Sequence, residues 1–209
     1  MNRMQMIDTA HLNALRDRIY NIRFAGNWKL LFGSIGYNLY IARQLIKVWG
    51  RGNEMLHTDK SGFTKALLMD HALSDEEWFA VQFSNYVKDT REDMLACMAI
   101  CFFHWAGRKQ LDLSGISKSL RKDYSLAKDF IGKLSFNEDI NFAFSVFFNR
   151  KVSSLQEKVE SSLICLFLLA EKHNIDLLWH IDKRLEYAEC KGTLRKLPVN
   201  FNTRCRNRL

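Results

Sequence analysis

TREDMLACMAICFFHWAG, residues 90–107, is the stretch that decides the fold class of this chain. It opens with Thr90 followed by two acids, a pattern typical of a helix start, because oxygen side chains and negative charge stabilise a helix N-terminus. From Met94 onward it is apolar nearly all round, as expected of a helix at the centre of a bundle. Gly107 is expected to end it. A helix of this kind predicts that further helices surround it.

The sequence on both sides supplies those helices. Ser74 and Ser154 each begin a capping box, in which a serine is followed three residues later by a glutamate. Pro198 is the only proline, so long helices are unobstructed, and no alternating strand pattern competes. We therefore predict an all-α, multi-helix bundle. The expected helices cover residues 11–24, 31–48, 63–69, 74–87, 90–107, 154–173 and 177–189, with two more within 114–150.

A single domain suits a chain of 209 residues. We expect a helical domain over residues 1–192, with a helical insertion at about 108–150, followed by a basic tail over 193–209. The five cysteines are odd in number and form no CxxC pair, which favours a reducing compartment. Neither a signal peptide nor a membrane span is recognisable, so a cytoplasmic protein without membrane contact is expected.

Positive charge is unevenly distributed along a chain whose net charge is +8. No Asp or Glu occurs from Arg18 to Asn53, a segment that carries six basic residues, and no acid follows Glu189. Such asymmetry favours an anionic partner, for example a nucleotide, RNA or an acidic protein. For the end of the chain, a merely solubilising tail is an equal alternative.

Two segments resemble the MazG-like nucleotide pyrophosphohydrolases. VKDTREDMLACMAICFFHWAG, residues 87–107, is similar to the family helix that carries K-D-T-x-E-D-E-L-A-D, and NIDLLWHIDKRLEYAECKG, residues 174–192, is similar to the family's last helix. The order of helices over residues 9–192 also fits. The resemblance implies a helical bundle that is commonly dimeric. In such a bundle, acids at i and i+3 on two helices hold Mg²⁺ for water attack on a nucleoside triphosphate.

The chain departs from that family where the metal would bind. The two acids of E-L-A-D fall on Met94 and Cys97, and those of the earlier E-x-x-E motif fall on Ile41 and Gln44. Because residues 18–53 contain no acid, no realignment restores the second pair. We therefore expect no cofactor, with Mg²⁺ bound only if residual activity exists.

Glu92 and Asp93 are the fallback metal ligands, since they are the only acids on this helix before residue 112. They lie roughly 200° and 100° around the helix from Met94, so neither replaces the lost ligands without a rotation of the helix. The alternative, which we favour, is that both stabilise the helix N-terminus.

A nucleotide phosphate could instead be held by basic residues. Lys183, Tyr187 and Lys191 recur at four-residue spacing and so share one helical face. Lys47 and Arg51 are the candidates in the acid-free segment. The alternative for the face on the last helix is a solvated surface whose lysines pair with nearby glutamates.

Cys97, Cys101 and His104 also share a helical face and could offer zinc ligands. Their spacing matches no common zinc module, and free cysteines in apolar helices are usually core residues. We therefore interpret them as part of the core.

Three functions remain open. The first is a catalytically inactive MazG-like domain that senses or sequesters a nucleotide or a nucleotide-derived signal. The second is a helical interaction scaffold that forms a homo-oligomer. The third is a residual pyrophosphohydrolase, which the lost carboxylates make the weakest. Nucleic acid is a possible partner that the sequence does not favour.

Overall fold

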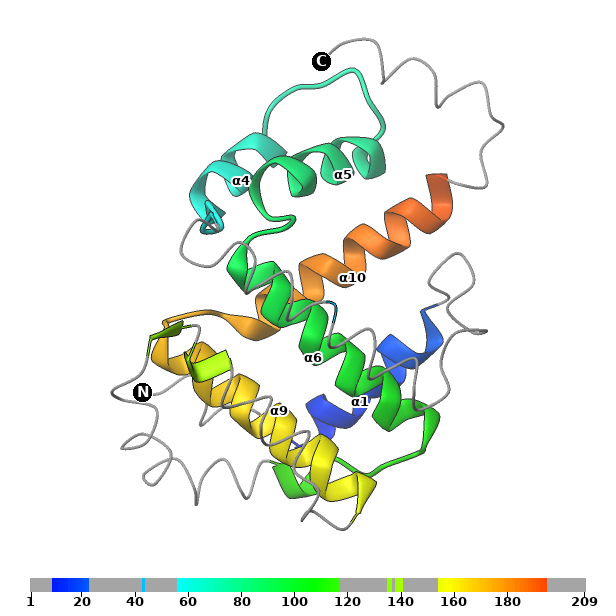
Figure 1. Ribbon diagram of the computed structural model, residues 1–209. Coiled ribbons are helices and arrows are strands. Elements are labelled where there is room, and N and C mark those ends of the chain that lie inside the picture. Colours follow the sequence, from blue (N-terminus) through cyan, green and yellow to red (C-terminus); the bar gives the residue numbers. More distant parts are fainter. Residues whose placement is uncertain are drawn as a thin grey trace.

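A computed structural model describes residues 9–22, 43, 56–116, 135–136, 138–140 and 154–194. These residues form helices and turns and contain no strand, which confirms the predicted all-α class (Figure 1). The helices are α1 (Thr9–Asn21), α4 (Lys60–Leu67), α5 (Asp75–Tyr86), α6 (Arg91–Arg108), α9 (Leu155–Lys172) and α10 (Leu177–Leu194).

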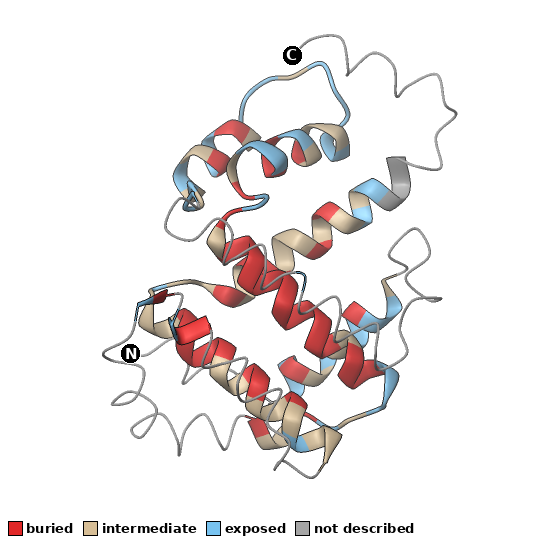
Figure 2. Ribbon diagram, in the orientation of Figure 1, coloured by how far each residue is buried: buried red, intermediate tan, exposed pale blue. Residues whose placement is uncertain are grey.

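Helix α6 lies at the centre of the fold and packs against α1, α9 and α10. Figure 2 shows it buried along most of its length, and only Arg91, His104 and Arg108 escape full burial. This is the position that its apolar character predicts, because a helix without a polar face has no side to turn to water.

Two apolar cores are present, and α10 contributes to both. Its residues Leu177, Ile181 and Leu185 enter the main core, which also takes side chains from α1, α6 and α9. A smaller core joins α4 and α5 to the other side of α10. It consists of Phe63, Phe79, Phe83, Val87 and Tyr187.

The predicted helix starts are confirmed at three places. Ser74 and Ser154 form complete capping boxes with Glu77 and Glu157. Thr90 caps α6 by accepting a hydrogen bond from the backbone N–H of Asp93. Each cap satisfies a backbone N–H that has no partner inside the helix.

Several predicted boundaries are wrong. Helix α1 ends at Asn21, not at residue 24. Helix α4 begins at Lys60, before the predicted residue 63, because the Asp59 side chain accepts a hydrogen bond from the Gly62 N–H and caps it. Helix α10 continues to Leu194, five residues beyond the predicted end.

Gly107 does not end α6 as expected, because the helix continues through it to Arg108. A Cβ atom at this glycine would lie 2.7 Å from Cβ of Tyr20 and 3.4 Å from the backbone oxygen of Arg16. The glycine therefore permits the close approach of α1 to α6.

Several predicted elements fall outside the described residues. They are the helix over 31–48, most of the two helices within 114–150, and the part of the basic tail beyond residue 194. Among the helices that are described, none combines the length and the apolar composition that crossing a membrane requires.

Candidate functional site

Two of the four positions at which the sequence predicts lost metal ligands, Met94 and Cys97, are buried on α6. Met94 belongs to the main apolar core, as does Cys101 on the same helix. Burial, assisted by the neighbouring Cys97, raises the pKa of the Cys101 thiol far above its ordinary value. A thiol that stays protonated is a poor metal ligand and a poor nucleophile.

His104 does not join the two cysteines in a metal site. Its ring packs beside that of Tyr20, with 5.9 Å between the ring centroids. Burial lowers the pKa of His104, and so does the positive charge of Arg108. Within the described ranges, no three His, Cys, Asp or Glu side chains are grouped so that they could hold a metal ion.

Glu92 fastens the segment before α4 to the start of α6. One of its carboxylate oxygens lies 2.7 Å from Nδ1 of His57, and the other accepts a hydrogen bond of 3.1 Å from the Thr58 N–H. Burial alone would raise the pKa of Glu92, but the hydrogen bonds from His57 and Thr58 hold that pKa below its ordinary value. The carboxylate is therefore ionised and serves as a structural acceptor.

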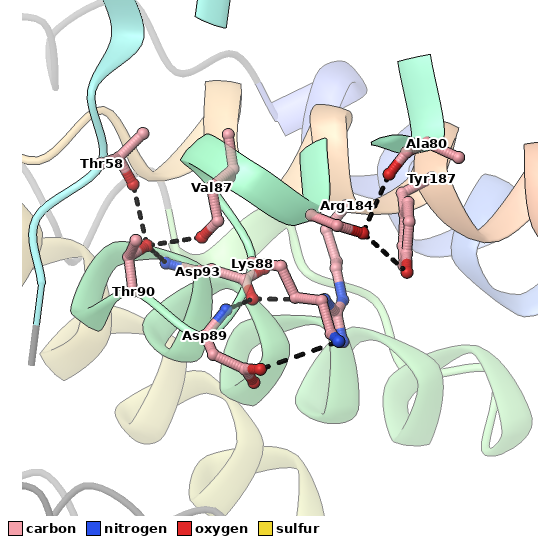
Figure 3. A network of polar contacts seen from close by, with 10 residues as sticks. Thr58, Ala80, Val87, Lys88, Asp89, Thr90, Asp93, Arg184 and Tyr187 are labelled. Atoms are coloured by element: carbon pink, nitrogen blue, oxygen red, sulfur yellow. Dashed lines mark hydrogen bonds and ion pairs between the residues drawn. The ribbon is translucent and has the colours of Figure 1, made fainter. Parts of the chain in front are cut away.

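Asp93 connects α6 to α10 and is only 1% exposed. Its Oδ2 accepts a hydrogen bond of 3.0 Å from the Asp89 N–H and one of 3.2 Å from Arg184 (Figure 3). Burial raises the pKa of Asp93 despite the opposing charge of Arg184. Its other oxygen, Oδ1, has no hydrogen-bond partner.

The fallback metal ligands are thus engaged with different elements. Glu92 binds the segment at residues 57–58, whereas Asp93 binds α10 and the residue just before the cap of α6. The Thr90 hydroxyl donates a hydrogen bond to the Val87 carbonyl and lies 2.8 Å from the Thr58 hydroxyl (Figure 3). This network holds three chain segments together at the beginning of α6.

The predicted phosphate-binding face of α10 is turned toward α5. Tyr187 is buried, and its ring stacks on Phe83 with 4.5 Å between centroids. Lys191 lies over the same tyrosine ring at 4.7 Å. Burial opposes ionisation of Tyr187, but hydrogen bonds involving Lys191 and Ser84 lower its pKa overall.

Lys183 belongs to the same face and also contacts other side chains of the domain. Its ammonium group lies 2.6 Å from a carboxylate oxygen of Glu186 and 5.8 Å from the ring centroid of Phe79. The structure therefore brings Lys183, Tyr187 and Lys191 together, as the spacing predicts, but in packing contacts within the domain. The other candidates, Ile41, Gln44, Lys47 and Arg51, lie outside the described residues.

Two buried charged or titratable groups were not singled out as sites by sequence reasoning. His180 is 1% exposed, and burial together with the charge of Lys60 lowers its pKa to about 4. Asp139 is buried and contacts Lys172 at 2.6 Å and His173 at 2.8 Å. The partners of Asp139 lie more than thirty residues away in the sequence, so no local pattern could reveal the pairing.

Comparisons with known proteins identify no relative: no protein-family model, no curated protein and no solved structure matches the chain.

Proposed function

We propose that this chain is a MazG-like helical domain that has lost hydrolysis and binds an anionic small molecule, a nucleotide or a nucleotide-derived signal. The observation that carries the proposal is the burial of Met94 and Cys97, which stand where the resemblance places metal ligands. Their side chains pack in a dry environment that would destabilise both a carboxylate and a hydrated Mg²⁺ ion.

Loss of hydrolysis follows from the donor atoms that remain. Mg²⁺ prefers several oxygen ligands in near-octahedral geometry. The carboxylate oxygens of Glu92 and Asp93 accept hydrogen bonds from protein groups on two separate elements. Residues 18–53 contain no carboxylate. A thioether and a thiol do not replace carboxylates as ligands of a hard cation.

Binding of an anion is supported by charge. The chain carries a net charge of +8, and six basic residues occur between Arg18 and Asn53 without one acid. Of these, Arg18 pairs with Asp182 and Glu189 on α10. Lys47 and Arg51 remain the proposed phosphate contacts, because Lys183 of α10 pairs with Glu186 and Lys191 lies over the Tyr187 ring of the same helix.

Thermal unfolding with a nucleotide panel tests this proposal. A true ligand at a hundred times its dissociation constant adds about 2.7 kcal/mol of stability and raises Tm. The double variant Lys47→Ala/Arg51→Ala should lose that shift, whereas the matched variant Lys65→Ala/Lys109→Ala, which alters exposed lysines of the described fold, should keep it. A panel that leaves Tm unchanged contradicts nucleotide binding.

Hydrolysis is tested separately, with Mg²⁺ and with Mn²⁺ over the same panel. We expect no release of pyrophosphate. Metal-dependent turnover that survives purification of the protein to homogeneity would favour a residual pyrophosphohydrolase instead.

An interaction scaffold is the second candidate, and the burial of Tyr187 against Phe83 favours it. Tyr187, which the sequence predicts as a ligand contact, is instead buried in packing between α10 and α5. If no nucleotide raises Tm and light scattering gives the mass of a stable homo-oligomer, the scaffold function replaces nucleotide binding.

A further inference from the structure

The turn between α4 and α5 exposes large apolar side chains. Leu68 is 83% exposed and Met69 is 63% exposed, and Leu73 lies in the same turn. Figure 2 shows that the segment joining α4 to α5 is largely exposed. Exposed side chains of this size in one short segment mark an interaction surface more often than chance exposure does.

This turn is held in place by its own contacts. The indole N–H of Trp78 donates a hydrogen bond of 2.9 Å to the carbonyl of Ala66. The ring of His71 stacks on Trp78 with 4.7 Å between centroids. The apolar side chains are therefore presented by a turn with fixed geometry.

The turn and helix α5, which follows it, are acidic in a basic protein. No lysine or arginine occurs from residue 66 to residue 87, a stretch that contains four acids. Asp70, Asp75 and Glu76 are exposed there beside the apolar side chains. We refer to Leu68, Met69, Asp70, Leu73, Asp75 and Glu76 together as the α4–α5 surface.

Helix α10 ends close to the α4–α5 surface. Its residue Cys190 packs against the smaller core, and the charge of Glu76 helps burial to raise the pKa of the Cys190 thiol. Figure 1 shows the last turns of α10 alongside the beginning of α5. The chain after Leu194 therefore leaves the fold next to this surface, and the seven residues to Phe201 can span about 23 Å.

The sequence that follows α10 complements the surface in two ways. Residues 195–209 carry five basic side chains and no acid. Leu197, Val199 and Phe201 alternate with other residues, so an extended backbone places all three on one side. Apolar and basic groups thus occur together in a segment tethered beside an apolar and acidic surface.

We propose that residues 195–209 bind to the α4–α5 surface of the same molecule. Leu197, Val199 and Phe201 cover the exposed apolar side chains, and the basic side chains lie against Asp70, Asp75 and Glu76. The proposal is independent of nucleotide binding. In this arrangement the basic tail has a binding site on the protein itself. A polyanion therefore competes with the α4–α5 surface for the tail.

Amide hydrogen exchange of the full chain, compared with a chain that stops at Leu194, tests the proposal. A short tether supplies an effective concentration on the order of 1 mM, so a contact with a dissociation constant of about 0.1 mM slows exchange over residues 66–78 about tenfold. We expect this slowing in the full chain, and we expect 0.5 M NaCl, roughly three times physiological ionic strength, to reduce it. Equal exchange in the two chains would overturn the proposal.

Substitutions locate the contact. Asp70→Asn/Asp75→Asn/Glu76→Gln should remove the protection in the full chain and change little in the shortened chain. The control Asp17→Asn/Glu171→Gln, which alters acids on α1 and α9, should leave the protection intact. If the triple substitution speeds exchange equally in both chains, it acts on α5 itself, and the proposal fails. Protection that grows with protein concentration would assign the tail to a second copy and would also overturn it.

Discussion

Asp93 shows what a single buried residue does in this fold. The sequence predicts that it stabilises the start of α6, and its hydrogen bond with the Asp89 N–H, just before the cap, agrees with that. Its second partner, Arg184, lies 91 residues further along the chain. Spacing within one helix cannot reveal such a partner, because it depends on how α10 packs.

Substitution of Arg184 tests how much the Asp93–Arg184 ion pair contributes to the free energy of unfolding. Arg184→Met keeps an apolar stem but leaves the 1%-exposed Asp93 without its cation. Removal of one partner from a buried ion pair costs about 3 kcal/mol at neutral pH. The control Arg18→Met breaks exposed ion pairs and should cost less than about 1 kcal/mol.

The cost of Arg184→Met should depend on pH. The pKa of Asp93 is already raised by burial and rises further without Arg184, so the folded variant binds a proton more readily than the unfolded chain does. Protonation of Asp93 then stabilises the folded variant as pH falls, so the deficit of the variant relative to wild type shrinks between pH 7.5 and pH 5. Urea unfolding at both pH values measures this, and a deficit that is independent of pH would show that the Asp93 charge is not its cause.

His180 predicts the opposite pH dependence. Its pKa is lowered to about 4 in the fold, against 6.5 in the unfolded chain, so the unfolded chain binds more protons between these values. His180 therefore costs stability as pH falls from 6.5 to 4, by about 3 kcal/mol in total. His180→Leu should remove this loss. Urea unfolding over that pH range should then show the free energy of unfolding of the variant rising relative to that of wild type as pH falls. A parallel decline of both proteins would contradict the assignment.

Helix starts could be read from the sequence, whereas close contacts between helices could not. The capping boxes at Ser74 and Ser154 depend on residues three positions apart, so a local pattern suffices. The start of α4 was misplaced because the pattern at Asp59 lacks the glutamate of a capping box. The sequence predicts a helix end at Gly107, but what requires a glycine there is the close approach of Tyr20 on α1, which no local pattern reveals.

Gly107→Ala tests the contact between α1 and α6. Alanine favours a helix interior by about 1 kcal/mol over glycine, but its Cβ would lie 2.7 Å from Cβ of Tyr20, which is fixed to the α1 backbone. Overpacking of this kind costs typically about 1–3 kcal/mol, so we expect net destabilisation and a lower urea midpoint. Gly115→Ala is the control, because its new atom meets the flexible carboxylate end of Glu160. Equal midpoints for the two variants would contradict the close approach.

The class of the whole fold was predictable because helical periodicity, caps and one proline all indicate the same answer. The arrangement of two cores on opposite sides of α10 was not. Trp179 and Ile181 are both apolar positions of one helix, yet Trp179 packs with the smaller core and Ile181 with the main core. The burial of Met94 and Cys97 was predictable, because both belong to an unbroken apolar stripe of α6.

Unequal cores imply unequal stability across the molecule. The core of α4, α5 and α10 has five buried residues, so these helices should open without unfolding α9. Phe83→Ala removes its most central ring, and a loss of about 3 kcal/mol should speed amide exchange in α4 and α5 roughly a hundredfold. Exchange in α9 should stay unchanged. Leu163→Ala, on α9 in the main core, should instead speed exchange in all described helices. If Phe83→Ala speeds exchange in α9 as strongly as in α5, the two cores unfold as one unit.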